Sequence, residues 1–165
     1  MARLSSVSEI YNHMPHIHDK IDFTVDVYIV YKNKVLLRKH DKYGIWLAVG
    51  GHIELNEDPN QAALREVKEE VGLDVLLLDT RQYKENRKGF NELITPVCLN
   101  RHAISDTHEH INMGYFAKSF SDKVIPENPS DQWKWCDKSD IETLTDIQPS
   151  VVFYAKLALQ TINSA

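Results

Sequence analysis

The sequence predicts one α/β domain in which a mixed β-sheet lies between helices on both of its faces. Three observations favour this fold class. Residues 23–31 are rich in β-branched and aromatic side chains, a composition typical of a strand. Residues 59–71 form an amphipathic helical pattern, and a second helical pattern begins at Pro149 and continues to about Ile162. With 165 residues the chain is long enough for one domain with a hydrophobic core.

The elements before the first helix are predicted from short local signals. We expect residues 1–20 to be an N-terminal extension of the domain, with a short helix at 5–13. The first strand, at 23–31, is followed by a turn at Asn33. Residues 35–38 then continue as the hairpin partner of this strand.

The helix at 59–71 has clear signals at both of its ends. Asp58 suits the N-cap position, Pro59 suits the first turn, and Gln61 completes a capping box. Gly72 provides a left-handed stop after the last turn. These signals predict the limits of the helix without any tertiary information.

The side chains of this helix fall into two stripes, because successive residues turn by about 100°. The stripe suited to packing on the sheet contains Ala63, Leu64, Val67 and Val71. The adjacent stripe contains Ala62 and the three acids Glu66, Glu69 and Glu70. Each like-charge pair costs about 0.2–0.5 kcal/mol on an exposed helix, and Arg65 can offset part of that cost. This cost is too small to decide whether the acids form a solvated face or a divalent-metal site.

The elements after this helix complete the predicted sheet and its second helical layer. Strands are expected at 74–79, 93–99 and 111–120, with a basic loop or hairpin at 80–91. Ser139 and Glu142 have the spacing of a capping box. C-terminal helices are therefore expected over 139–165, and residues 1–165 are expected to form a single domain.

The acids of the first helix belong to a longer pattern that spans residues 51–73. It consists of Gly51, Glu57 and the run Arg65-Glu66-Val67-x-Glu69-Glu70-x-Gly72-Leu73. At average residue frequencies, a chance match in a chain of this length has a probability of about 1 in 10⁷. The chain therefore resembles the Nudix hydrolases, since this segment matches their Nudix box without a gap or a substitution. A looser resemblance extends from Thr24 to Leu144.

The resemblance implies both a fold and a reaction. The fold is the Nudix-like α/β/α sandwich, a mixed β-sheet with the box helix packed on it. The reaction is metal-dependent hydrolysis of the diphosphate bond in a nucleoside diphosphate linked to another moiety. Mg²⁺ or Mn²⁺ is the expected cofactor, because both ions prefer hard carboxylate oxygens. The chain has Val49 where many family members have proline, but it keeps Gly50 and Gly51 of that loop.

The resemblance also implies roles for individual residues. The implied metal ligands are the backbone carbonyl of Gly50 and the carboxylates of Glu66, Glu69 and Glu70. Glu57 is implied to support the metal shell, and Arg65 is implied to orient a glutamate. Glu54 is either an acid that supports these ligands without itself binding the metal, or a solvated turn residue.

The general base is open between a box glutamate and an acid on a distant loop. Glu69 is the candidate within the box. Glu127 lies in a proline-rich loop at about the place where a distant acid is expected, and Glu92 and Glu109 are its rivals. The box does not choose between these alternatives.

Two residues outside the box are candidate substrate contacts. Arg38 lies at a strand end, and guanidinium groups suit phosphate recognition. Trp46 precedes the box loop and could stack on a base. An exposed strand end and core packing explain the same two residues. The chain lacks the downstream marks of enzymes for ADP-ribose, dinucleoside polyphosphates and NADH, which favours a nucleoside triphosphate or a related nucleotide.

Histidines gather in two further segments, over 13–18 and 102–110. Those of the first segment flank Pro15 and do not share one face, so surface or packing roles are expected. His108 and His110 alternate along a predicted strand and therefore share one face. A contact with substrate or a second metal stays open beside ordinary packing for this pair.

Composition restricts the partners and the compartment. The formal net charge of −5 and the pI of about 5.9 do not favour stable nucleic-acid binding. Cys98 and Cys136 are too few for a disulfide framework, which indicates a reducing compartment. Since no apolar run is long enough to span a bilayer and the N-terminus lacks a signal-peptide core, we expect a cytoplasmic protein with no membrane partner. A homodimer is a further possibility.

A different class of function remains open beside hydrolysis. The fold can also serve as a non-catalytic module that senses a nucleotide or a metabolite. Such relatives usually lose box glutamates, whereas this chain keeps all of them. An isomerase on the same scaffold would need a dedicated acid–base cysteine, and neither Cys98 nor Cys136 has a recognisable context for that role.

Overall fold

The computed structural model describes residues 17–40 and 43–164, arranged as ten strands and three helices. The helix predicted at 5–13 lies outside the described residues. In chain order the elements are β1 Ile21–Tyr31, β2 Lys34–Lys39, β3 Trp46–Leu47, β4 Val49–His52, α1 Pro59–Val71, β5 Val75–Leu77, β6 Asn86–Arg87, β7 Phe90–Asn91, β8 Cys98–Ala103, β9 Glu109–Ser119, β10 Gln132–Cys136, α2 Lys138–Thr143 and α3 Pro149–Ser164.

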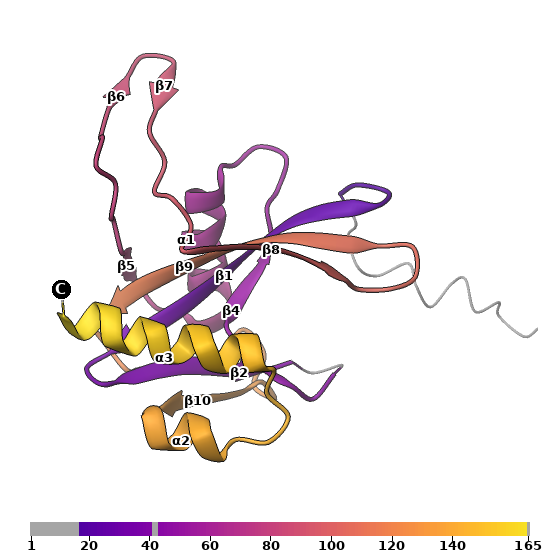
Figure 1. The fold of residues 1–165 in the computed structure, drawn as a ribbon, viewed down its shortest axis with the longest axis vertical. Coiled ribbons are helices and arrows are strands. Elements are labelled where there is room, and N and C mark those ends of the chain that lie inside the picture. The colour runs from indigo at the N-terminus through magenta and orange to yellow at the C-terminus, as the bar shows by residue number, and fades with distance from the viewer. Residues whose placement is uncertain (1–16, 41–42, 165) are drawn as a thin grey trace, which may run out of the picture.

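Eight of the strands form one mixed sheet whose centre is the pair β1 and β9. The order along the sheet is β10-β2-β1-β9-β5, while β3, β4 and β8 extend the pairing of β2, β1 and β9. The pairing of β1 with β9 is parallel, and the other pairs in the sheet are antiparallel. β6 and β7 form a separate hairpin that stands away from the sheet (Figure 1).

Helices cover both faces of this sheet, as the sequence predicts (Figure 1). On one face α1 packs through Ala63 and Val67 against Val25 and Val27 of β1. On the other face α3 packs against a second set of core residues, which includes Tyr28 of β1. Because successive side chains of a strand point to opposite faces, β1 contributes to both cores and needs apolar residues in succession. The predicted α/β/α arrangement with a mixed sheet is confirmed.

The end signals of α1 are those that the sequence predicts. The carboxylate of Asp58 accepts hydrogen bonds from the backbone N–H groups of Asn60 and Gln61, at 2.8 and 2.9 Å. The side chain of Gln61 accepts from the N–H of Asp58 in return, at 2.9 Å. Gly72 ends the helix in the left-handed region, with φ of 68°. These local contacts fix the helix start six residues before Arg65, at Pro59.

The rotation of α1 about its axis differs from the predicted one. Ala62 is fully buried, whereas Leu64 is 44% exposed and lies outside the core. The buried arc is therefore centred nearer to Glu66 and Glu70, whose side chains are only 14% and 11% exposed. The prediction was right for Ala63, Val67 and Val71, which are buried, and wrong for Leu64, because a helical wheel gives relative angles but not the side that faces the sheet. The consequence is that two acids lie between the helix and β4 instead of in open solvent.

Three of the later elements also differ from their predicted positions. The strand expected at 93–99 begins later, as β8, because Cys98 pairs with Gly114 of β9. Leu76 of β5 is 62% exposed, so this strand is not buried along its whole length. The cap of α2 is Asp137 and not Ser139, since the Asp137 carboxylate accepts from the N–H of Asp140 at 2.8 Å. The segment 80–91 contains the β6–β7 hairpin.

Candidate active site

A cleft of about 550 Å³ opens at the junction of β4, the loop over 53–58 and α1. Gly50 and Gly51 of β4 form one side of it, and Arg65, Glu66 and Glu70 of α1 form the other. Glu54 and Leu55 of the connecting loop complete the rim. The cleft is thus built largely from the segment that carries the box pattern.

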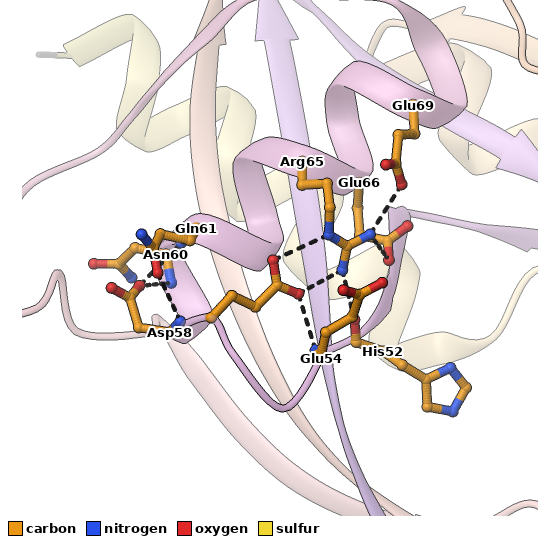
Figure 2. Close-up of polar contacts among 9 residues, drawn as sticks. His52, Glu54, Asp58, Asn60, Gln61, Arg65, Glu66 and Glu69 are labelled. Carbon is orange, nitrogen blue, oxygen red and sulfur yellow. Dashed lines mark hydrogen bonds and ion pairs between the residues drawn. The ribbon is translucent and has the colours of Figure 1, made fainter. Parts of the chain in front are cut away.

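The guanidinium group of Arg65 is the centre of the polar network in this cleft (Figure 2). It donates to both oxygens of Glu57, at 3.0 Å from Nε and 2.6 Å from Nη2. Its Nη1 donates to Glu66 at 2.8 Å and to Glu69 at 2.9 Å. Nη2 also donates to the backbone carbonyl of His52 at 2.9 Å. One side chain therefore fixes three carboxylates and attaches α1 to the end of β4.

Close packing of β4 against α1 at Gly51 and against β1 at Gly50 explains both glycines. A Cβ atom on Gly51 would lie 2.5 Å from Oε1 of Glu66, so any side chain there would displace that carboxylate. A Cβ atom on Gly50 would lie 2.0 Å from the carbonyl oxygen of Val25 on β1. The space at Gly51 lets Glu66 of α1 approach β4 directly, and the space at Gly50 lets β4 lie close to β1.

Glu70 is held from two sides by groups that come from the sheet. Nη1 of Arg38, on β2, donates to Oε1 of Glu70 at 2.8 Å. The backbone N–H of Gly50, on β4, donates to Oε2 at 3.1 Å. Arg38 also lies 3.6 Å from Oδ2 of Asp131, a buried acid that precedes β10. The structure thus brings Arg38 and Gly50 to Glu70, although Gly50 contacts it through its N–H group.

Burial dominates the electrostatics of the two inward-facing acids. Burial raises the pKa of Glu70 to about 7, although Arg38 and the N–H of Gly50 act in the opposite direction. Burial also raises the pKa of Glu66, and Arg65 again opposes the effect. By contrast, its hydrogen bonds to Arg65 lower the pKa of Glu57. Adjacent buried carboxylates whose protonation is favoured in this way would gain from a further positive charge in the cleft.

The donor set of the cleft is suited to a hard divalent cation. Carboxylate oxygens on one helix, one turn apart, can hold a single Mg²⁺ or Mn²⁺ ion or a pair of ions. Glu66 and Glu70 line the cleft opposite Gly50 and Gly51 of β4. Glu69, which is 54% exposed, lies at the solvent edge of the same hydrogen-bond network. The pKa values of Glu66 and Glu70 point to the same conclusion, because a bound cation would stabilise their ionised forms.

The three distant candidates for the general base contact different segments of the structure. The backbone N–H of Glu127 donates to the carbonyl of Glu70 at 3.1 Å, and the charge of Glu127 contributes to raising the pKa of Glu70. Glu92 bonds through its backbone to Glu85, in the segment of the β6–β7 hairpin. Glu109 pairs with Arg101 at the first residue of β9. Of the three distant acids, Glu127 is the one placed beside α1.

Trp46 and Glu54 have surroundings that the sequence does not specify. Trp46 packs against the core between the sheet and α3, with Nζ of Lys39 5.8 Å from its ring centroid. It is therefore on the face of the sheet opposite α1 and is not among the described residues that line the cleft. The N–H of Glu54 donates to Oε1 of Glu57 at 2.9 Å, so Glu54 closes the loop before the helix.

Sequence reasoning missed two contributors to the site. Asp131 contacts Arg38 from a loop that is far from it in sequence, and no local pattern marks it. His52 supplies its carbonyl to Arg65, while its ring points away from that group (Figure 2). Its position next to Gly51 was a usable signal, but only the strand pairing shows which way the ring points. Among the described residues, the helices are all too short or too polar to cross a bilayer.

Comparison with known proteins agrees with this geometry. The model of the NUDIX domain family matches residues 21–157. The crystal structure of a NUDIX-family hydrolase from Clostridium perfringens is 36% identical and superposes with a TM-score of 0.75, covering 86% of this chain and 97% of that one.

Two characterised relatives match over shorter segments. The 8-oxo-dGTP diphosphatase of Proteus vulgaris is 55% identical over 40 residues, which are 22% of this chain and 36% of that protein. The dihydroneopterin triphosphate diphosphatase of Escherichia coli (strain K12) is 44% identical over 45 residues, 27% of this chain and 30% of that protein. The chain thus spans only about a third of the length of each of these two relatives. The match of the family model over most of the sequence shows that this chain belongs to the Nudix hydrolase family.

Proposed function

We propose that this chain is a metal-dependent diphosphatase that acts on a nucleoside triphosphate or a related nucleotide. The observation that carries the proposal is the arrangement of the box acids, of which Glu66 and Glu70 line the cleft. Glu57, Glu66 and Glu69 are joined by Arg65, and Glu70 is held next to them by Arg38. A non-catalytic relative would have no need to keep this complete set.

In this proposal Glu66, Glu70 and the carbonyl of Gly50 hold Mg²⁺ or Mn²⁺, and Glu69 is either a further ligand or the general base. When bound, the cation neutralises charge on the diphosphate and makes water a stronger nucleophile. The protein contributes the positions of the ligands, since Arg65 holds Glu66 and Glu69 and Gly51 leaves room for the Glu66 carboxylate. Preorganised ligands of this kind reduce the reorganisation that the reaction would otherwise require.

The remaining chemistry is a proton transfer to a carboxylate of the chain. A water molecule that attacks phosphorus must lose a proton, and Glu69 and Glu127 are the acids that lie next to the proposed ligands. Glu69 is already fixed by Arg65, whereas Glu127 lies in the loop between β9 and β10. Glu57 acts as a positioning residue, because its contacts are to Arg65 and the N–H of Glu54.

A triphosphate substrate is supported by two independent arguments. The chain lacks the sequence marks of three other Nudix substrate classes. The two partial relatives are named for 8-oxo-dGTP and for dihydroneopterin triphosphate, and both of these compounds are triphosphates. A cleft of about 550 Å³ is of the size that holds a small-molecule ligand.

The test is a turnover assay with a panel of nucleoside triphosphates, nucleotide sugars, ADP-ribose and dinucleotides. Each compound is incubated with Mg²⁺ or Mn²⁺ and with a chelator as the blank. We expect release of diphosphate from a triphosphate substrate only when the metal is present. The sensing alternative predicts nucleotide binding by calorimetry without product, and this result would overturn the proposal.

A further inference from the structure

A second group of metal-ligating side chains lies outside the box. Asp22, His108 and His110 offer ligand atoms that all lie within 4.8 Å of one another. All three residues are buried, with 0%, 5% and 9% of their surface exposed. His52 extends the group, because its Nε2 is 3.4 Å from Oδ2 of Asp22. No step in the proposed hydrolysis uses these side chains.

The strand register brings the four residues together. Asp22 of β1 is the direct partner of His110 of β9, and His108 lies two residues earlier, at the turn that leads into β9. His52 of β4 pairs with Thr24, which is two residues after Asp22 and on the same face of β1. This face is the one that carries Tyr28 towards α3, so the group lies on the opposite side of the sheet from Glu66 and Glu70.

The distances within the group agree with metal coordination. In a tetrahedral site with Zn–N distances of about 2.0–2.1 Å, neighbouring ligand atoms are about 3.4 Å apart. Oδ2 of Asp22 lies 3.2 Å from Nε2 of His108 and 3.4 Å from Nε2 of His52. The ring centroids of His52 and His108 are 5.0 and 5.4 Å from that of His110. The ligand atom of His110 lies within 4.8 Å of those of Asp22 and His108, so small side-chain rotations would bring it to a coordinating position.

His110 is the residue that favours a cation over a simple hydrogen-bonded network. Its Nε2 is buried and has no hydrogen-bond partner among the described residues. A neutral imidazole nitrogen is the form that binds metal, and a buried polar atom without a partner is costly. Coordination would satisfy this nitrogen.

We propose that Asp22, His52, His108 and His110 bind a transition-metal ion of the Zn²⁺ type at a site separate from the box carboxylates. Three imidazoles and one carboxylate are the ligand set that favours such an ion over Mg²⁺. Four protein ligands fill a tetrahedral shell, so the site is structural. It ties β1, β4 and β9 together at the end of the sheet and stabilises the buried charge of Asp22.

The test is a Zn²⁺ titration of the metal-stripped full chain against a chromophoric chelator of known affinity. We expect one equivalent to bind with a Kd below about 1 µM, and the Tm to rise with it. His110→Gln and His108→Ala should each weaken binding by at least about 100-fold. His40→Ala is the matched control and should bind as the wild type does, because the ring of His40 packs on Tyr43, 4.7 Å between centroids, and is not part of this group.

Two further measurements separate this site from the box and from failures of folding. The double variant Glu66→Gln/Glu70→Gln should keep the high-affinity Zn²⁺ equivalent, whatever its effect on turnover. Co²⁺ bound to the wild type should show the intense visible absorption of a tetrahedral ion, a readout that needs no variant. Loss of Zn²⁺ binding in the box variant, unchanged binding by a folded His110→Gln, or the weak spectrum of octahedral Co²⁺ would each overturn the proposal.

Discussion

Arg38 of β2 and Glu70 of α1 form an ion pair with 2.8 Å between Nη1 and Oε1. The other oxygen of Glu70 accepts the N–H of Gly50, so both oxygens are already oriented towards the sheet. The two side chains are only 17% and 11% exposed. Glu70 is therefore the acid of the box whose position depends most on contacts from outside the helix.

Replacement of this acid by its amide tests its role as a ligand. We expect Glu70→Gln to lower kcat by at least about 100-fold, because the cation loses an anionic oxygen while the side-chain volume is kept. The measurement is turnover at saturating Mg²⁺, together with Mn²⁺ affinity by electron paramagnetic resonance. Glu142→Gln, at a surface pair with Lys156, is the control and should leave both values unchanged. Turnover of Glu70→Gln at the wild-type rate would exclude Glu70 as a ligand.

Arg65→Lys tests whether Arg65 acts by orienting the acids. Lysine keeps the positive charge but cannot donate at once to both oxygens of Glu57, to Glu66 and to the carbonyl of His52. We expect kcat to fall by about 10- to 100-fold and the KM for the nucleotide to change by less than about 3-fold. The measurement is the change in kcat compared with the change in KM. A rise in KM with unchanged kcat would show instead that Arg65 contacts the substrate.

Gly50→Ala should destabilise the fold through a backbone clash. The new Cβ would lie 2.0 Å from the carbonyl oxygen of Val25, and strand β1 cannot move without disturbing the core. We expect the free energy of unfolding to fall by at least about 2 kcal/mol in urea titrations. Gly89→Ala is the comparison, because its surroundings are open and only its φ of +79° opposes a side chain, at about 1 kcal/mol. Equal losses for the two variants would contradict the predicted clash.

The thiol of Cys136 should be inert in the folded protein. It is fully buried, and burial raises its pKa to about 11. Because the raised pKa favours the protonated form, only roughly 1 in 1,000 of these thiols is ionised at pH 8. Burial also raises the pKa of Cys98. A chromogenic disulfide reagent should react only slowly with the native protein. In denaturant it should react with both cysteines. Rapid reaction of two thiols in the native state would refute the prediction.

The position of the α2 cap can be checked with two alanine variants. Asp137→Ala should reduce the free energy of unfolding by about 1 kcal/mol, because it removes the acceptor for the N–H of Asp140. Ser139→Ala should change stability by less than about 0.5 kcal/mol, since Ser139 lies inside the helix. If Ser139→Ala were the more destabilising variant, Ser139 would be the N-cap, as the sequence pattern indicates.

The sequence by itself determined the features that depend on neighbours along the chain. The limits of α1 follow from Asp58, Gln61 and Gly72, because capping contacts join residues within one turn. The strand character of β1 follows from its side-chain composition, and the family follows from the spacing of the box residues. The helix limits and the strand character are decided by interactions that span a few residues, and the box pattern is read directly from the order of residues 51–73.

The tertiary structure decided which groups from distant segments meet. The ion pair of Arg38 with Glu70, the contact of Arg38 with Asp131 and the group around Asp22 all depend on strand register and on the rotation of α1. Such contacts join residues that are far apart in sequence, so no local propensity encodes them. Packing against the sheet determines these contacts. Only one rotation of α1 buries Ala62 and Ala63 and also places the box acids next to the glycines of β4.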